Sequence, residues 1–466
     1  MKTVQLLGLD FGTTTSGAVM ASANLVRNTV TGRMELTEVA EQFRSDLVFT
    51  PYQGDRLDES RIEELLDSWF RAGGVERDDL FGGGALLTGL TAQAENAAGL
   101  IGLIRRRLGD ALVARADDPC LEAWLAFMGS CAGLSRRHPT RPIINLDIGG
   151  GTTNLALGQR GEVLATGCLY VGARHFQVVP GSYRLVKLSR YARALLASLK
   201  IGKEPGDDLT AAEVSAILAF YLDLLENAVA GRQFQSEVAR LHEQVAFSPG
   251  EHTDPIVTLS GGVGELVYSQ FQGKPWPATT FFGDLGIDLA RRLLESSRWV
   301  KFWNTFCPES AGRATVYGML RHSTQISGAT VFLPHPEILP LADLPILGTI
   351  SDTSTEAHLR HLLNLARRSP RGGGLRVELA QPDPETVRAL GMKLAGMLQD
   401  FPPAHPLVLF TPHNIGKTLG HYASAWGALP VSLVVADEIA VKNAQYAHLG
   451  PLREQVIPVS VYGVRD

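Results

Sequence analysis

Leu9-Asp10-Phe11-Gly12-Thr13-Thr14-Thr15-Ser16 near the start of the chain and Leu146-Asp147-Ile148-Gly149-Gly150-Gly151-Thr152-Thr153 further on share one pattern. Both read Leu-Asp-apolar-Gly-x-x-Thr-hydroxyl. Each stretch follows a short apolar run, residues 4–9 and residues 143–146. Short apolar runs that end at glycine are typical of buried strands that enter a tight turn. The sequence therefore contains one strand-and-turn unit twice.

The residues after each glycine turn indicate how the unit continues. Apolar runs at 17–20 and 34–36 follow the first turn, and runs at 155–157 and 163–165 follow the second. Each turn therefore joins two strands of a meander, whereas the phosphate loops of Walker and Rossmann proteins open a helix. Two such units that face one another predict a two-lobed α/β protein with a central cleft.

A third glycine turn and a change of pattern near residue 333 complete the predicted organisation. The apolar run 256–259 enters Ser260-Gly261-Gly262-Val263-Gly264, and a helix is expected from 265 to 271. We expect a first lobe over 1–138, a second lobe over 139–332 and a C-terminal α/β unit over 333–466. The second lobe holds a helical insertion at about 180–250, where Thr210 and Glu213 have the spacing of a capping box. Four prolines between 334 and 345 indicate a linker before the C-terminal unit.

The glycine turns favour phosphate binding. A glycine turn exposes consecutive backbone N–H groups with no side chain in the way, and threonine hydroxyls add donors. Two such turns facing each other would grip the phosphates of a nucleotide from both sides, and the third would let a flat adenosine approach the backbone. The candidate nucleotide-binding residues are Asp10, Gly12, Thr13, Thr14, Thr15, Gly149, Gly150, Gly151, Thr152, Thr153, Gly261, Gly262 and Gly264.

Asp10 and Asp147 stand at the ends of the two strands, beside the expected phosphates. Two carboxylates suit Mg²⁺, which keeps several waters and uses phosphate oxygens as further ligands. A carboxylate can also orient an attacking water. Glu122, at the start of a predicted helix, is a second candidate for that catalytic role. The alternative for Glu122 is a structural carboxylate that interacts favourably with the helix dipole.

Composition narrows the class of protein. The 466 residues carry a formal net charge of -5, with 45% hydrophobic and 20% charged residues. This balance predicts a soluble protein with no sequence-wide attraction to nucleic acid or anionic membrane. The four cysteines lack zinc-ligand spacing, and we expect reduced thiols in a cytoplasmic protein. The start of the chain is not typical of a signal peptide, and no run of about 20 apolar residues predicts a membrane span.

The order of the three glycine turns resembles the two phosphate motifs and the adenosine motif of the actin and Hsp70 superfamily. Chaperones, sugar kinases and filament proteins share those motifs, so the motifs alone do not decide function. Five further stretches are similar to the reactivating factors of ethanolamine ammonia-lyase. They are residues 85–97 (ALLTGLTAQAENA), 313–318 (RATVYG), 322–328 (HSTQISG), 414–420 (NIGKTLG) and 456–461 (VIPVSV).

The resemblance implies an actin-like ATPase fold and a reactivating chaperone. Such a factor is a weak ATPase with ATP/ADP and Mg²⁺ as cofactors. Its client is ethanolamine ammonia-lyase, an adenosylcobalamin enzyme, from which it releases damaged cobalamin so that intact cofactor can bind. On this account Asp10 and Asp147 hold Mg²⁺ through water, and Asp147 or Glu122 orients the hydrolytic water. The family also implies association with an ethanolamine-utilising microcompartment, and the homo-oligomeric state stays open.

Three other classes remain open at this point. A small-molecule kinase of the same superfold would need a substrate-binding carboxylate base in the cleft, which the sequence does not identify. An actin-like scaffold would polymerise with nucleotide and would not stimulate a lyase. A binding module without hydrolysis is disfavoured by the full set of loop residues.

Overall fold

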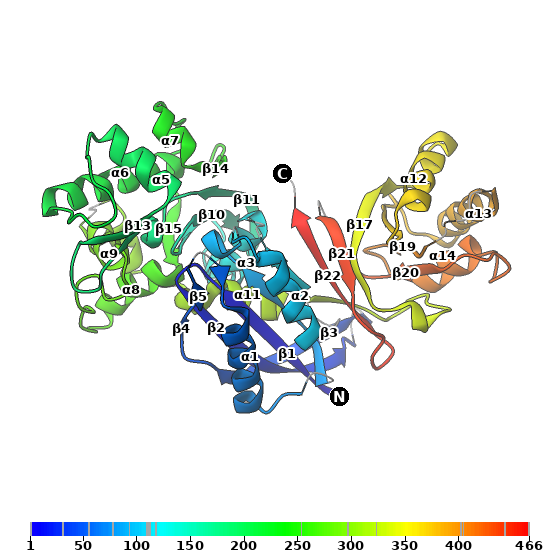
Figure 1. Cartoon of the computed structure of the whole chain (residues 1–466). Coiled ribbons are helices and arrows are strands. Elements are labelled where there is room, and N and C mark those ends of the chain that lie inside the picture. The colour runs from blue at the N-terminus through cyan, green and yellow to red at the C-terminus, as the bar shows by residue number, and fades with distance from the viewer. Residues whose placement is uncertain are drawn as a thin grey trace.

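The computed structural model describes residues 2–29, 32–54, 56–76, 79–92, 94–108, 113–116, 119–252, 254–295, 298–322, 324–400, 403, 405–441 and 444–464. Gln93 and Ser323, which stand in two of the family-like stretches, lie outside the described residues. Three bodies follow one another along the chain: a first lobe, a second lobe and a C-terminal unit (Figure 1). Among the described residues, no helix is long and apolar enough to cross a membrane.

The first lobe is built on the predicted meander. Strands β1 (Lys2–Phe11), β2 (Thr15–Arg27) and β3 (Met34–Arg44) pair antiparallel, and β4 (Val48–Phe49) adds to β2. β7 (Leu80–Leu87) and β8 (Val113–Ala116) extend the sheet in parallel on the other side of β1, giving the order β3-β2-β1-β7-β8. Between β4 and β8 lie the small hairpin of β5 (Tyr52–Gln53) and β6 (Arg56–Leu57) and two helices, α1 (Glu59–Gly73) and α2 (Ala97–Leu108).

Side chains alternate between the two faces of this sheet along each strand, and different helices pack on the two faces. Leu7, Leu9 and Phe11 pack with α1 and α2. Val4 and Leu6 point to the opposite face, where they pack with α11 (Ala314–His322). The first lobe therefore takes one of its covering helices from a much later part of the chain.

The second lobe repeats the meander. β9 (Ile143–Ile148), β10 (Thr153–Gln159) and β11 (Glu162–Leu169) pair antiparallel, and β15 (Ile256–Ser260) lies parallel to β9. β14 (Glu243–Val245) adds to the β11 edge, so the order is β14-β11-β10-β9-β15. The shared core order of the two sheets, with a glycine turn between the first two strands of each, is the arrangement of the actin-like fold. The predicted fold class is confirmed.

The helices of the second lobe pack with its sheet in one hydrophobic core. Some of these helices belong to the insertion. The insertion carries the hairpin of β12 (Phe176–Val178) and β13 (Leu185–Leu188), followed by α5 (Arg190–Ser198), α6 (Ala211–Val229) and α7 (Glu237–Leu241). Thr210 and Glu213 form the expected capping box at the start of α6. After β15 come α8 (Gly261–Phe271), α9 (Gly286–Leu294) and α10 (Val300–Trp303).

Relative to the predicted division at residue 138, three helices pack against the lobe on the other side of it. α3 (Pro119–Ser130) and α4 (Ala132–Arg137) precede β9 but pack into the core of the second lobe, through residues such as Phe127. α11 follows the second lobe but packs on the first sheet. α3 and α11 cross in close contact, because a Cβ on Gly129 would lie 1.9 Å from the Ala314 oxygen and a Cβ on Gly318 2.0 Å from the Leu125 oxygen. This crossing joins the two lobes.

The C-terminal unit has one twisted sheet with the order β16-β22-β21-β17-β18-β19-β20. Four of its strands run parallel with helices between them: β17 (Leu341–Ile350), α12 (Glu356–Arg368), β18 (Gly373–Val377), α13 (Pro384–Asp400), β19 (Leu407–Phe410), α14 (Gly416–Ala423) and β20 (Leu433–Ala436). The remaining three are β16 (Thr324–Ser327), β21 (Ala444–Leu449) and β22 (Ile457–Val464), which pair antiparallel.

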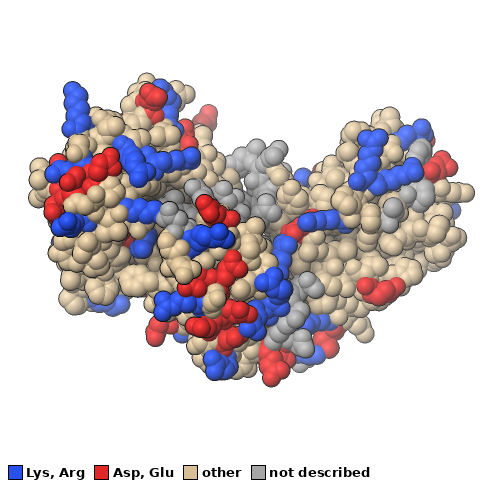
Figure 2. Space-filling model, in the orientation of Figure 1, with Lys and Arg blue, Asp and Glu red and all other residues tan. Residues whose placement is uncertain are grey.

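The unit differs from the sequence prediction at its start. β16 already belongs to it, so it begins before residue 333. Residues 341–350 form a strand instead of a linker, and Pro345 lies within it, paired with Tyr446 of β21 just after a register shift between Leu341 and Leu344. Asp343, which lies within this register shift, forms an ion pair with Arg105 on α2, with 2.9 Å between the guanidinium nitrogen and the carboxylate oxygen. This ion pair connects the C-terminal unit to the first lobe. On the face in Figure 2, acidic and basic side chains are mixed over the first lobe.

Candidate nucleotide site

A cavity of about 300 Å³ lies between the two sheets. Most of the residues that the sequence singles out line this one cavity: Asp10, Gly12, Thr13, Thr14, Thr15, Glu122, Asp147, Gly149, Gly150, Gly151, Thr152, Gly261 and Gly262. Thr153 and Gly264 do not line it. The Thr153 hydroxyl is buried and donates to the Val171 carbonyl at 2.7 Å, and Gly264 gives helix α8 room to pack against Leu259.

The two glycine turns have the same backbone geometry. The Gly12 N–H donates to the Thr15 carbonyl at 3.0 Å, and the Gly149 N–H donates to the Thr152 carbonyl at 2.9 Å. Each turn thus closes directly at the end of its strand, β1 or β9. The repeat in the sequence is therefore a repeat in structure, with one turn supplied by each lobe.

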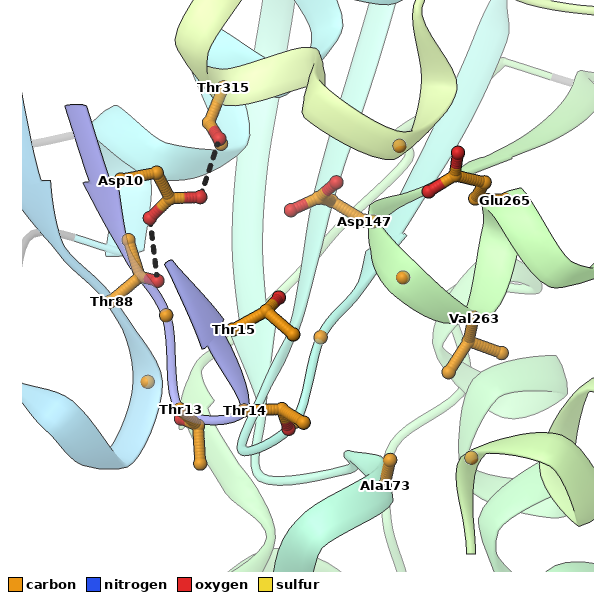
Figure 3. A pocket seen from close by; sticks show the side chains of 18 of the residues that line it. Asp10, Thr13, Thr14, Thr15, Thr88, Asp147, Ala173, Val263, Glu265 and Thr315 are labelled. Carbon is orange, nitrogen blue, oxygen red and sulfur yellow. Dashed lines mark hydrogen bonds between the residues drawn. The ribbon is translucent and has the colours of Figure 1, made fainter. Parts of the chain in front are cut away.

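The two turns approach each other closely across the cleft; Figure 3 labels the threonines of the first turn, Thr13, Thr14 and Thr15. A Cβ on Gly150 would lie 2.5 Å from the Thr14 hydroxyl, and a Cβ on Gly89 would lie 2.4 Å from the Thr13 hydroxyl. Gly89 also has a positive φ of 60°. Thr14 Oγ1 is buried and makes no hydrogen bond of good geometry within the described residues, although it lies close enough to Asp284 to favour the ionised form of that carboxyl. A buried hydroxyl left in this state favours a ligand that accepts or donates there.

The two carboxylates differ in how they are held. Asp10 accepts from the Thr88 hydroxyl at 3.3 Å and from the Thr315 hydroxyl at 3.5 Å (Figure 3). Asp147 accepts from the Ser260 hydroxyl at 2.5 Å, and the Asn145 amide donates to Ser260 at 2.8 Å. Asp10 is therefore oriented by one hydroxyl from the segment after β7 and one from α11. Asp147 is oriented by a chain of buried hydrogen bonds inside the second lobe.

Burial shifts both carboxyls toward the protonated form, and for Asp10 the charge of Asp147 adds to this shift. Burial, followed by the charge of Asp147, raises the pKa of Asp10 to about 7. Burial raises the pKa of Asp147 to about 6 despite the Ser260 hydrogen bond. A nearby cation would return both groups to the ionised form. No cluster of three or more His, Cys, Asp or Glu ligands occurs in the described parts of the chain. Two carboxylates with phosphate and water oxygens fit Mg²⁺, which needs no all-protein cage.

These shifts predict a pH effect on the nucleotide-free protein. A carboxyl with a raised pKa binds its proton more tightly in the folded than in the unfolded state, so its contribution to the free energy of unfolding falls as pH rises from about 4 to about 7. We expect Asp10→Asn, which has no charge to bury, to be more stable than wild type at pH 8 and to lose that advantage near pH 5. Urea unfolding at both pH values measures the difference.

The comparison with wild type removes the effect of other groups. Burial lowers the pKa of His175 to about 3, which acts in the opposite direction at low pH but equally in both proteins. If the Asp10→Asn protein were no more stable than wild type at pH 8, this would contradict the assignment of Asp10 as a buried carboxyl with a raised pKa.

Glu122 lies in the first turn of α3 and lines the cavity with its side chain almost fully buried. The Asn154 amide donates to it at 2.8 Å. The position satisfies both sequence interpretations, since a carboxylate in the first helical turn also interacts favourably with the dipole. The structure brings Glu122 into the same cavity as Asp10 and Asp147.

The third turn opens α8 directly. Gly261 has a positive φ of 76°, and a Cβ there would lie 2.5 Å from the Ile148 oxygen. A Cβ on Gly262 would meet nothing within 4 Å. Gly261 is therefore required by the strand-to-helix turn, whereas Gly262 leaves its backbone open to the cavity.

Several cavity residues escaped the sequence prediction. They include Thr88, Gly89, Glu265, Phe282, Asp284, Arg313 and Thr315. Four of them, Thr88, Gly89, Arg313 and Thr315, stand in the family-like stretches 85–97 and 313–318. Those stretches were a usable signal, but no local spacing links residues so far apart to the glycine turns.

A family model described as "Ethanolamine utilisation protein EutA" matches residues 2–464. The chain belongs to the EutA family. Two curated relatives in the EutA family are both named "Ethanolamine ammonia-lyase reactivase EutA". The Salmonella typhimurium protein is 31% identical and the Escherichia coli protein 30% identical, and each match covers 99% of this chain and 98% of the relative.

Solved structures overlap with this member of the EutA family only loosely. MreB5 of Spiroplasma citri bound to AMPPNP is 15% identical, with a TM-score of 0.29 over 63% of this chain and 97% of that chain. The Acidaminococcus fermentans (R)-2-hydroxyglutaryl-CoA dehydratase component A is 13% identical, with a TM-score of 0.30 over 68% of this chain and 97% of that chain.

Proposed function

We propose that this chain is an ATP-dependent reactivase of ethanolamine ammonia-lyase, which releases damaged cobalamin so that intact adenosylcobalamin can bind. The observation that carries the proposal is the similarity, over almost the whole chain, to two relatives named as reactivases of that lyase. The cavity supports it, because its two facing glycine turns suit a nucleoside triphosphate.

In this proposal the two turns bind the phosphates. The backbone N–H groups and hydroxyls of residues 12–15 and 149–152 donate to phosphate oxygens from opposite lobes. The buried Thr14 hydroxyl is one such donor. Gly262 leaves space for the adenosine against the start of α8, and Gly261 forms the turn that presents it.

Asp10 and Asp147 would hold Mg²⁺ through water. When bound, Mg²⁺ neutralises charge on the phosphates. Thr88, Thr315 and Ser260 fix the orientation of the two carboxylates by the hydrogen bonds described above. Asp147 or Glu122 accepts a hydrogen bond from the hydrolytic water and orients it.

To release cobalamin from the lyase, nucleotide binding must change how the two lobes are arranged. A ligand shifts a conformational equilibrium only when it binds the two states with different affinity. One phosphate turn comes from each lobe, so a triphosphate that engages both turns favours the closed cleft. Loss of the terminal phosphate removes part of that contact. Because α3 and α11 pack closely where they cross, this crossing would act as the hinge about which the lobes turn.

The test is recovery of an inactivated lyase. Ethanolamine ammonia-lyase is blocked with cyanocobalamin, then incubated with this protein, Mg·ATP and adenosylcobalamin, and its activity is assayed. We expect activity to return with ATP and not with a non-hydrolysable analogue. No recovery in a sample that binds ATP normally would refute the proposal. Phosphorylation of a small molecule, or light scattering from nucleotide-dependent polymers, would instead support the kinase or scaffold class.

A further inference from the structure

A ring contact bridges the two lobes beside the cavity. Phe49, on β4 of the first lobe, packs edge-on against Phe282 of the second lobe, with ring centroids 6.4 Å apart and an interplanar angle of 63°. Phe281 packs edge-on against Phe282 at 5.1 Å. Phe282 lines the cavity, whereas Phe49 does not and is 54% exposed. The contact therefore lies on the solvent side of the cavity wall.

The Phe49 side of this contact is tied to the first phosphate turn. Thr50, the next residue, donates through its N–H to the Thr14 carbonyl at 3.0 Å and through its hydroxyl to the Gly12 carbonyl at 2.6 Å. Phe49 itself pairs with Thr15 across the β2–β4 ladder. The segment that carries the Phe49 ring is thus hydrogen-bonded to two residues of the turn and paired in the sheet with a third.

The Phe282 side is tied to the second phosphate turn by one residue. The Arg174 N–H donates to the Gly150 carbonyl at 2.6 Å, and its guanidinium donates to the Phe282 carbonyl at 3.4 Å. The same segment is held from the other end, where the Leu285 N–H donates to the Ala173 carbonyl at 3.1 Å. Each ring therefore moves with the phosphate turn of its own lobe.

We propose that Phe49 and Phe282 form a clasp that holds the lobes together over bound nucleotide and sets the rate at which nucleotide leaves. The proposal rests on the nucleotide binding proposed above. Opening the cleft separates the rings and exposes their apolar faces to water, which disfavours opening. Because each ring follows its phosphate turn, a nucleotide that draws the turns together also closes the clasp.

The test measures release of a fluorescent ATP or ADP analogue in a stopped-flow chase. Phe49→Ala removes the clasp without changing a cavity-lining side chain, and we expect release about three- to tenfold faster, the range for an aromatic pair. Phe49→Trp keeps a ring and should release close to the wild-type rate. Trp426→Ala, which removes an exposed ring stacked on His421 in the C-terminal unit, is the matched control and should leave release unchanged.

A double variant separates the clasp from a general effect on the cavity. If the rings act as a pair, Phe49→Ala adds no further acceleration in a Phe282→Ala background. Wild-type release in Phe49→Ala, with nucleotide bound normally, would overturn the clasp and leave the nucleotide site standing. Wild-type protein that binds no nucleotide would overturn the clasp and the proposed function together. Thermal melts confirm that each variant is folded.

Discussion

Reactivation of ethanolamine ammonia-lyase is expected to fall by about a hundredfold or more when Asp10 or Asp147 is replaced by alanine, the scale of losing one preorganised charge-stabilising group. Both carboxylates line the cavity at the ends of equivalent strands, and each has its own hydroxyl partners. In the proposed site, removing either would leave Mg²⁺ with one carboxylate and disturb the charge balance at the phosphates. The measurement is the recovery rate of cyanocobalamin-inactivated lyase at saturating Mg·ATP.

The matched control is Asp223→Ala, which removes an exposed carboxylate from α6 in the insertion and should retain full activity. Glu122→Gln distinguishes the two candidates for orienting water. If Glu122 has that role, the variant binds ATP but hydrolyses it slowly. If Glu122 is structural, hydrolysis is kept and Asp147 remains as the candidate. An Asp10→Ala/Asp147→Ala protein with full reactivation would refute the metal-site assignment.

The free energy of unfolding is expected to fall by about 2–3 kcal/mol in Gly318→Ala and by more in Gly318→Leu, the scale of overpacking a closed contact. A Cβ on Gly318 would lie 2.0 Å from the Leu125 oxygen, and the atom it meets is backbone, which cannot rotate away. Since α3 and α11 belong to different lobes, the whole crossing must separate. Chemical unfolding of the nucleotide-free protein measures the change.

Gly396→Ala is the control for helix propensity. Gly396 lies inside α13, and a Cβ there would meet nothing within 4 Å. Alanine is intrinsically the better helix former by about 1 kcal/mol, so this substitution should stabilise or be neutral. A Gly318→Ala protein that gains stability like Gly396→Ala would show that the crossing is not closely packed.

The sequence was most informative where chemistry and local structure coincide. The Leu-Asp-apolar-Gly-x-x-Thr repeat predicted both β1–β2 and β9–β10 turns, because strand pattern and glycine turn are local properties. The same repeat also predicted that Asp10 and Asp147 lie in one cavity, since equivalent strands of facing lobes end at the same cleft.

Prediction was weaker where distant segments meet. Nothing local indicates that α11 covers the first sheet or that α3 belongs to the second. The hydroxyl partners of Asp10 come from positions 88 and 315, and a pairwise contact over such separations leaves no periodic trace. Pro345 misled because proline is rare inside a central strand, whereas here it pairs with Tyr446 of β21, a contact that local sequence does not reveal.

The late position of α11 has a consequence for biosynthesis. The last strand of the first sheet ends at Ala116, and the helix that covers its second face begins at Ala314. At about 5–20 residues per second, roughly 200 residues separate the two by on the order of 10–40 s. Throughout that interval the apolar face formed by Val4, Leu6, Val19 and Ala21 stays uncovered on the ribosome. The first lobe to be translated is therefore completed only after the second lobe has emerged.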